Sequence, residues 1–225
     1  VAPGMKAVKA VILDLDHTVV ASGINFSEMR AKIVDYLRQR LPPSEQIDIS
    51  KPTYEITRSA VETLQKHGLS AIIPEVMNEI NRIMTDTEMK YVSKATAIDG
   101  AIQALRRLKD AGVKVGILTR SCRKYADEVL KTTGLSAYID EVAARDDCAT
   151  PKPDPTQVYS LMEKMRVRPG ETVMVGDNPV DSLCAKNSGV RFIGVLTGPW
   201  GAGRASQLGS DVVPSIKELP DFLGV

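Results

Sequence analysis

Two aspartates separated by one residue follow a short apolar run near the start of the chain. Residues 11–13 are Val, Ile and Leu; Asp14 comes next, and Asp16 two positions later. Alternate side chains of a strand share a face, so both carboxylates should leave the carboxyl end of a buried strand, where ligands of open α/β sheets bind. Two neighbouring carboxylates repel each other and need a cation or a shared proton. Mg²⁺ is suited to this pair because it binds carboxylates and phosphate oxygens; a strand that merely ends in a polar turn is the alternative.

A second apolar run ends in hydroxyl and basic side chains. Residues 99–112 carry apolar side chains at helical spacing, and residues 113–118 then read as a strand that delivers Thr119 and Arg120. A helix followed by a strand in this order is typical of a parallel sheet. A hydroxyl at a strand end, followed by free backbone amides, can bind phosphate oxygens. Alternatively, Thr119 caps the next helix.

Lys152 stands between prolines. Pro151, Pro153 and Pro155 alternate with Lys152 and Asp154, and such spacing holds the backbone extended. The ammonium group is therefore presented at a fixed place. This arrangement suits the neutralisation of clustered carboxylates and phosphate better than a solvated lysine before a helix.

A third strand end supplies two more acids. Residues 172–175 read as a short buried strand, Gly176 permits a tight turn, and Pro179 suits the first turn of a helix. Asp177 lies at the end of this strand, and Asp181 lies one helical turn further on the same side. Asp177 is also a candidate N-cap of the helix.

In this order, the acid pair, the hydroxyl, the lysine and the second acid pair resemble the four motifs of the haloacid dehalogenase superfamily of aspartate-nucleophile phosphotransferases. The resemblance extends from about residue 9 to residue 196. Residues 99–120 and 152–198 are particularly similar to the phosphoglycolate-phosphatase-like branch. One departure is His17, where the family most often has Gly; His is among the residues that tolerate unusual backbone angles, so a small geometric effect is expected.

The resemblance implies the role of each motif residue. Asp14 would attack phosphorus and form an aspartyl-phosphate, and Asp16 would protonate the leaving alcohol and then activate water. Mg²⁺ would be held by Asp14, the backbone carbonyl of Asp16, and Asp177, with Asp181 bound directly or through water. The phosphoryl oxygens would be bound by Thr119, Arg120 and Lys152. The implied substrate is a small phosphorylated metabolite, with phosphoglycolate as the first candidate.

Two other functions stay open on the sequence. A sugar phosphomutase has the same chemistry but requires specific sugar contacts, and none is evident in the chain, so hydrolysis is favoured. A phosphoaspartate signalling protein similar to a receiver domain also combines strand-end acids with Thr and Lys. Receivers, however, have no long helical insertion and carry the phospho-acceptor on a different strand from the acid pair. The presence of Asp16 argues against a dehalogenase, because the dehalogenases of the superfamily lack this acid.

The segment between the first two motifs is too long for a simple crossover. Apolar stripes at helical spacing predict helices over residues 26–37, from residue 50 or 53 to 67, and 74–91. The segment resembles the helical cap of the superfamily. The expected architecture is therefore a doubly wound, parallel-sheet, Rossmann-like α/β core of residues 1–22 and 97–225, with residues 23–96 inserted as a small α-helical cap domain.

Composition agrees with this class. The 225 residues have a formal net charge of +1, which gives no electrostatic reason to expect a nucleic-acid partner or an anionic membrane. Three cysteines without metal-binding spacing read as reduced thiols, and no segment has the length or apolarity to span a bilayer, so a cytoplasmic location is expected. No signal indicates an oligomeric state. The glycine-rich segment 197–204 resembles the loop after the last core strand, with Trp200 either at its entrance or packed on the core.

Overall fold

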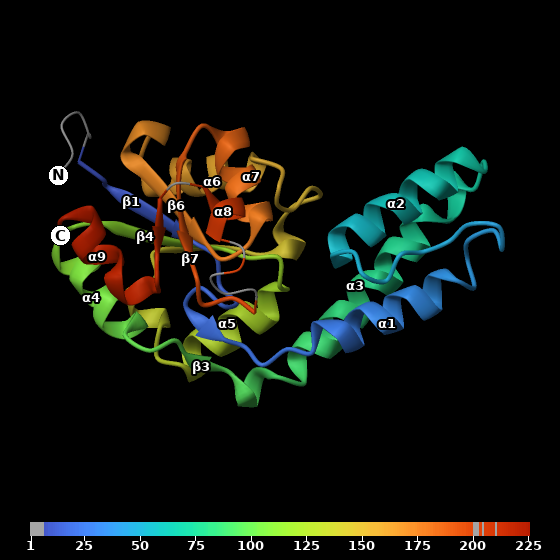
Figure 1. The fold of residues 1–225 in the computed structure, drawn as a ribbon, viewed down its shortest axis with the longest axis horizontal. Helices are drawn as coiled ribbons and strands as arrows, with labels where there is room; N and C mark the ends of the chain where they lie inside the picture. The colour runs from blue at the N-terminus through green and yellow to red at the C-terminus, as the bar shows by residue number, and fades with distance from the viewer. Residues whose placement is uncertain (1–6, 200–202, 204, 210) are drawn as a thin grey trace. The chain divides into compact units, whose positions relative to one another are not determined.

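The chain forms two compact units, an α/β unit and a helical unit (Figure 1). The computed structural model describes residues 7–199, 203, 205–209 and 211–225, so Trp200 lies outside the described residues. The α/β unit comprises Val1–Ser22 and Val92–Val225, and the helical unit comprises Gly23–Tyr91.

A six-stranded sheet forms the centre of the α/β unit. Its order is β5-β4-β1-β6-β7-β8, and every neighbouring pair is parallel. The strands are β1 (Ala10–Leu13), β4 (Lys114–Leu118), β5 (Glu141–Ala143), β6 (Thr172–Gly176), β7 (Arg191–Val195) and β8 (Val212–Val213). From β1 the chain builds outward to β4 and β5, then crosses to β6 and builds outward on the other side. The predicted doubly wound fold is confirmed, and its strand order reverses between β1 and β6, where such sheets bind ligands.

The register aligns the carboxyl ends of the three central strands. Leu13 of β1 lies opposite Ile117 of β4 and Val175 of β6. The residues that follow these strands therefore emerge at the same edge of the sheet. All four residues of β1 and all five of β6 are buried, as expected of parallel strands covered on both faces.

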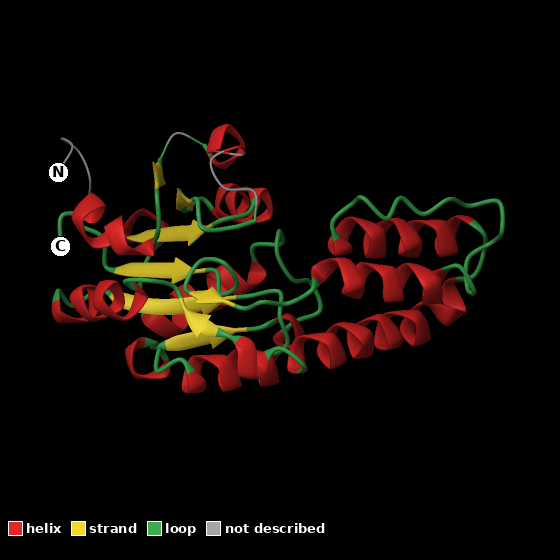
Figure 2. Cartoon of the chain, turned by 60° about the horizontal axis from the view of Figure 1, so that its bottom comes forward, coloured by secondary structure: helices red, strands yellow, loops and turns green. Residues whose placement is uncertain are grey.

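Helices lie on both faces of this sheet (Figure 2). The helices of the α/β unit are α4 (Ala101–Asp110), α5 (Arg123–Thr132), α6 (Thr156–Met165), α7 (Pro179–Ser188), α8 (Ala205–Leu208) and α9 (Leu219–Leu223). Short 3₁₀ helices span Val92–Lys94, Ser136–Tyr138, Arg145–Asp147, Pro169–Glu171 and Ile216–Glu218. Apolar residues of α6 and α7, among them Leu161 and Ala185, pack on Ile12 and Met174 in one core cluster. Burial of this kind supplies most of the stability that holds the strand ends in register.

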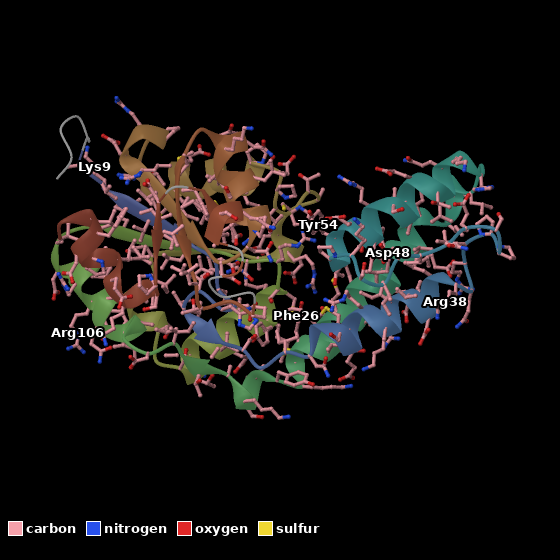
Figure 3. All side chains as sticks on the ribbon, viewed as in Figure 1. Lys9, Phe26, Arg38, Asp48, Tyr54 and Arg106 are labelled. Carbon is pink, nitrogen blue, oxygen red and sulfur yellow. The ribbon has the colours of Figure 1, made fainter. Side chains whose placement is uncertain are left out.

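The helical unit consists of α1 (Phe26–Leu37), α2 (Thr53–Lys66) and α3 (Ile73–Met89), with a 3₁₀ helix at Ser70–Ile72. Each helix buries an apolar stripe, formed by Met29, Ile33, Val34 and Leu37, by Ile56, Ala60 and Leu64, and by Val76, Ile80 and Met84. The three predicted helices are confirmed. Charged side chains cover the outer faces of both units, as at Arg38 after α1 and Arg106 on α4 (Figure 3).

A two-stranded antiparallel ribbon joins the two places where the chain leaves and re-enters the α/β unit. β2 (Val20–Ala21) pairs with β3 (Thr96–Ala97), with Val20 opposite Ala97. The insertion therefore starts and ends side by side, which allows a helical unit to be added without disturbing the sheet.

Among the helices that the structure describes, none has the length and apolarity needed to cross a membrane.

Candidate active site

Three carboxylates meet at the edge of the sheet where the strand order reverses. Asp14 follows β1, Asp177 follows β6, and Asp181 lies in the first turn of α7. One ligand oxygen from each lies within 4.8 Å of the others. Aligned strand ends bring Asp14 together with two acids that lie more than about 160 positions later in the sequence.

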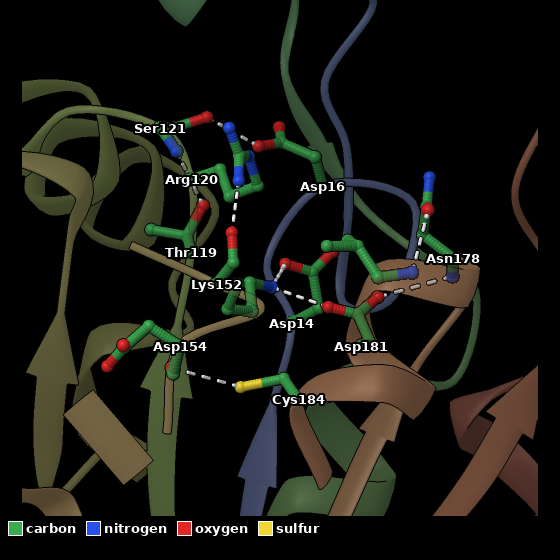
Figure 4. Close-up of polar contacts among 11 residues, drawn as sticks. Asp14, Asp16, Thr119, Arg120, Ser121, Lys152, Asp154, Asn178, Asp181 and Cys184 are labelled. Atoms are coloured by element: carbon green, nitrogen blue, oxygen red, sulfur yellow. Dashed lines mark hydrogen bonds and ion pairs between the residues drawn. The ribbon is translucent and has the colours of Figure 1, made fainter. Parts of the chain in front are cut away.

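Lys152 lies between two of these acids (Figure 4). Its Nζ is 2.6 Å from Asp14 Oδ1 and 2.6 Å from Asp181 Oδ1, and only 1% of the lysine is exposed. Burial alone would lower the pKa of Lys152, but the two carboxylates outweigh it and hold this pKa above its ordinary value. The ammonium group is therefore a permanent positive charge in the site.

One ammonium does not compensate three buried carboxylates. Burial, reinforced by the charges of Asp14 and Asp181, raises the pKa of Asp177 to about 8. Burial also raises the pKa of Asp181 to about 6, although Lys152 acts in the opposite direction. Burial likewise raises the pKa of Asp14 against the attraction of Lys152. The donor set therefore fits a hard divalent cation, because carboxylate oxygens are the ligands that Mg²⁺ prefers and its charge would favour the ionised forms.

Asp181 is oriented by the start of α7. Its Oδ2 accepts a hydrogen bond from the backbone N–H of Asn178 at 3.2 Å, and Asn178 Oδ1 in turn accepts from Val180 N–H at 3.2 Å. This reciprocal capping pair directs Asp181 Oδ1 toward Lys152. The N-cap is Asn178, so the alternative in which Asp177 caps this helix is wrong.

Asp16 lies apart from the three carboxylates and points toward Ser121 (Figure 4). Its Oδ2 accepts from the Ser121 hydroxyl at 2.7 Å, and its Oδ1 accepts from the Tyr125 hydroxyl at 3.1 Å. The Asp16 side chain is therefore directed toward α5. Its expected metal contact, through the backbone carbonyl, stays a prediction.

Thr119 is buried at the end of β4. Its hydroxyl oxygen accepts from Ser121 N–H at 3.0 Å, which leaves the hydroxyl hydrogen available as a donor. The N-cap of α5 is Cys122, whose sulfur accepts from Tyr125 N–H. The alternative in which Thr119 caps this helix is therefore wrong.

Arg120 reaches the Lys152 segment. Its Nη1 donates to the backbone carbonyl of Lys152, and the Arg120 carbonyl accepts from Arg145 Nη1 at 2.9 Å. The two arginines thus tie the loops after β4 and β5 to the backbone that presents the lysine. A contact of Arg120 with the phosphoryl group stays a prediction.

His17 adopts the left-handed backbone conformation, with φ of 63°. Its carbonyl accepts from the Thr197 hydroxyl at 2.5 Å, which links the turn after Asp16 to the loop after β7. Burial lowers the pKa of the imidazole, so it is neutral near pH 7. The expected tolerance of His17 for an unusual backbone angle is thus seen in a conformation that few non-glycine residues adopt.

Sequence reasoning did not single out Ser121, Tyr125 or Gly198 as site residues. Ser121 could have been found, because it lies two positions after Thr119 and shares its face on an extended chain. Tyr125 could not, since its place in the first turn of α5 says nothing about which carboxylate it meets. A Cβ on Gly198 would overlap the Asp177 carboxylate, a proximity that only the fold reveals.

A family model of haloacid dehalogenase-like hydrolases matches residues 11–195 of this chain, a range that includes the acidic cluster, Asp16, Thr119 and Lys152. The chain belongs to the haloacid dehalogenase-like hydrolase family. This confirms the resemblance drawn from the motifs. It also identifies the class of enzyme as a hydrolase.

Individual relatives of the same family support a phosphohydrolase. The chain is 28% identical to the pyrophosphatase PpaX of Bacillus velezensis, over 98% of this chain and 97% of that protein. It is 28% identical to a plasmid-encoded phosphoglycolate phosphatase of Cupriavidus necator, over 95% of this chain and 92% of that protein. A hydrolase from Pseudomonas syringae has the same fold, with a TM-score of 0.71 at 20% identity, covering 96% of this chain and 98% of that one.

Proposed function

We propose that this haloacid dehalogenase-like hydrolase is a Mg²⁺-dependent phosphatase that hydrolyses a small phosphomonoester through an aspartyl-phosphate on Asp14. The observation that carries the proposal is the position of the Asp14 carboxylate. It lies at the reversal point of the sheet, 2.6 Å from a buried ammonium and grouped with Asp177 and Asp181. A carboxylate in such surroundings can attack phosphorus while the charge of the phosphoryl group is balanced.

Two steps divide the reaction. In the first, an Asp14 oxygen forms a bond to phosphorus, the bond from phosphorus to the leaving oxygen breaks, and Asp16 gives its proton to that oxygen. In the second, water attacks phosphorus, the bond to Asp14 breaks, and Asp16 takes up a proton from the water. General acid–base assistance of this kind is typically worth about 10²–10⁴-fold in rate.

The remaining residues position the phosphoryl group and balance its charge. Lys152 and Thr119 bind oxygens of the transferred group, the lysine as a fixed charge and the threonine through its available hydroxyl hydrogen. Asp14, Asp177, Asp181 and the Asp16 carbonyl would hold Mg²⁺, which when bound neutralises carboxylate and phosphoryl charge. Positioning and electrostatic stabilisation account for most of phosphoryl-transfer catalysis.

The substrate class is the finer part of the proposal. Relatives along nearly the whole chain are named pyrophosphatase and phosphoglycolate phosphatase, and both names indicate small, strongly anionic phosphate compounds. We therefore infer a small phosphorylated metabolite, with phosphoglycolate and pyrophosphate as the first compounds to test. The helical unit of Gly23–Tyr91 would act as the cap that reads this substrate, and the rest of the chain as the catalytic core.

Phosphate release provides the test. p-Nitrophenyl phosphate, phosphoglycolate, pyrophosphate, sugar phosphates and nucleoside monophosphates are each incubated with wild type and Asp14→Asn, with Mg²⁺ or with EDTA. We expect release that requires both Mg²⁺ and Asp14. Asp110→Asn, at an exposed position of α4, is the matched control and should retain full activity. Release by Asp14→Asn at the wild-type rate would exclude Asp14 as nucleophile, and conversion of a sugar phosphate without phosphate release would favour a mutase.

A further inference from the structure

Both oxygens of the Asp16 carboxylate accept hydrogen bonds from side-chain hydroxyls. Ser121 Oγ donates to Oδ2 at 2.7 Å, and the Tyr125 hydroxyl donates to Oδ1 at 3.1 Å. Each carboxyl oxygen has more than one acceptor position, so Asp16 can accept both hydrogen bonds and still carry the proton that it transfers. Neither donor belongs to the acidic cluster or to the motif residues.

The start of α5 places both donors. β4 ends at Leu118, and Ser121 and Tyr125 stand on either side of the Cys122 N-cap. The backbone of Ser121 is fixed by its N–H bond to Thr119 Oγ1, and the backbone of Tyr125 by its N–H bond to Cys122 Sγ. Tyr125 is completely buried and Ser121 is 4% exposed. Packing therefore leaves these hydroxyls little freedom to move.

Two donors on two oxygens constrain the carboxylate in a way that one donor does not. The terminal torsion of an aspartate is broad, so a carboxylate held at one oxygen can still rotate. With both oxygens held, the plane of the Asp16 carboxylate is defined. A small displacement of a proton-transferring group can reduce rate greatly because the reacting atoms must be aligned.

We propose that Tyr125 and Ser121 are positioning residues that orient the Asp16 carboxylate for proton transfer to the leaving group. This inference rests on the proposed function, in which Asp16 protonates the leaving oxygen. It predicts that removal of either hydroxyl slows bond cleavage most for substrates whose leaving group needs a proton. For a substrate whose leaving group departs as a stable anion, removal of either hydroxyl should hardly change the rate of bond cleavage.

The test uses kcat/KM, which reports on the steps up to and including the first irreversible one. It therefore excludes dephosphorylation of the enzyme. p-Nitrophenyl phosphate has a leaving group that departs readily as an anion, and phenyl phosphate has one that benefits from protonation. We expect Tyr125→Phe and Ser121→Ala to lower kcat/KM for phenyl phosphate about tenfold, the effect of losing one strong hydrogen bond, and for p-nitrophenyl phosphate by less than about twofold. Tyr159→Phe removes the same atom from an exposed tyrosine and should change neither value.

Asp16→Asn separates the inference from the proposed function. Suppose that Asp16→Asn loses much more kcat/KM on phenyl phosphate than on p-nitrophenyl phosphate. If Tyr125→Phe and Ser121→Ala then lose kcat/KM equally on both substrates, or lose none, the inference alone is overturned. The absence of such dependence on leaving group in Asp16→Asn itself removes Asp16 as the acid, which overturns the inference together with the acid step of the proposed mechanism. In the Asp16→Asn background, adding Tyr125→Phe should change kcat/KM for phenyl phosphate by less than about twofold, since a residue that acts only through Asp16 has nothing left to orient. A further tenfold loss in that double variant would show a structural effect instead.

Discussion

Gly198 lies directly against the carboxylate of Asp177, with no room for a methyl group between them. A Cβ on Gly198 would overlap Asp177 Oδ2, and a Cβ on Gly176 would overlap Asp181 Oδ2 in the same manner. Each of the two later acids is thus packed on a glycine. These contacts fix where the carboxylates can lie, even though neither glycine carries a functional group.

Gly198→Ala should therefore displace Asp177 from the acidic cluster. Changes in the groups that support metal ligands typically cost roughly 10–100-fold in metal affinity or activity, and we expect a loss in that range. The measurement is the Mg²⁺ concentration that gives half-maximal phosphate release. Gly170→Ala is the control, because nothing lies within 4 Å of a Cβ there, and its Mg²⁺ dependence should match wild type. An unchanged Mg²⁺ dependence in Gly198→Ala would show that the loop after β7 yields without moving Asp177.

Lys152→Met should destabilise the fold as well as abolish turnover. The lysine is 1% exposed and pairs with Asp14 and Asp181, and removal of one partner from a buried ion pair costs about 3–5 kcal/mol. In EDTA, the thermal unfolding midpoint should fall by several degrees. Because three carboxylates then lack any cation, added Mg²⁺ should raise the midpoint more in Lys152→Met than in wild type.

Lys9→Met provides the comparison for that variant. Lys9, which lies just before β1 (Figure 3), also forms an ion pair, with Glu171 at 2.8 Å, but its side chain is 60% exposed. Exposed pairs contribute about 0–1 kcal/mol, so the midpoint should hardly move. A midpoint for Lys152→Met as high as that for Lys9→Met would mean that the buried ammonium does not compensate the acids.

The central sheet could be predicted because its strands are continuous apolar runs that end in chemistry-bearing residues. β1, β4 and β6 are buried on both faces, which requires such runs. The ribbon of β2 and β3 could not be predicted, since each strand has two residues and forms only when the ends of the insertion meet. The three-residue strand β5 is similarly defined by its neighbour β4.

The residue types that form the site could be predicted from the sequence, but the direction in which each side chain points could not. The sequence places Asp14 and Asp16 on one face of an extended chain, yet the structure turns them to different partners, Lys152 and Ser121. The backbone leaves regular strand geometry after Leu13, so alternation no longer fixes where the side chains point. Helix capping had the same limit: the pattern allowed Asp177 as the cap, whereas Asn178 takes that place.

Arg120→Gln should lower kcat more than it weakens substrate binding. The guanidinium donates to the Lys152 carbonyl, so its loss releases the segment that presents the ammonium. Bonds from charged donors contribute about 1.5–3 kcal/mol, which corresponds to a loss of roughly tenfold or more. Steady-state kinetics and inhibition by inorganic phosphate measure the two effects separately. A large rise in KM and in the phosphate inhibition constant, with kcat retained, would instead support the sequence-based prediction that Arg120 binds the phosphoryl group.

Stabilisation by Mg²⁺ should increase as pH rises from about 6 to about 8. The folded protein holds the pKa of Asp181 at about 6 and that of Asp177 at about 8, whereas an ordinary aspartate has 3.8. Over this range the metal-free folded state retains protons that the unfolded chain has released, so the free energy of unfolding in EDTA decreases as pH rises. Bound Mg²⁺ requires ionised carboxylates and releases those protons, so its affinity increases by at most about tenfold per pH unit for each proton released.

Thermal unfolding of wild type at pH 6 and pH 8, with Mg²⁺ and with EDTA, measures both effects. Asp177→Asn removes the group with the higher pKa and should flatten the dependence between pH 7 and 8. An increase in midpoint with Mg²⁺ that is the same at both pH values in wild type would contradict the coupling of these acids to the metal.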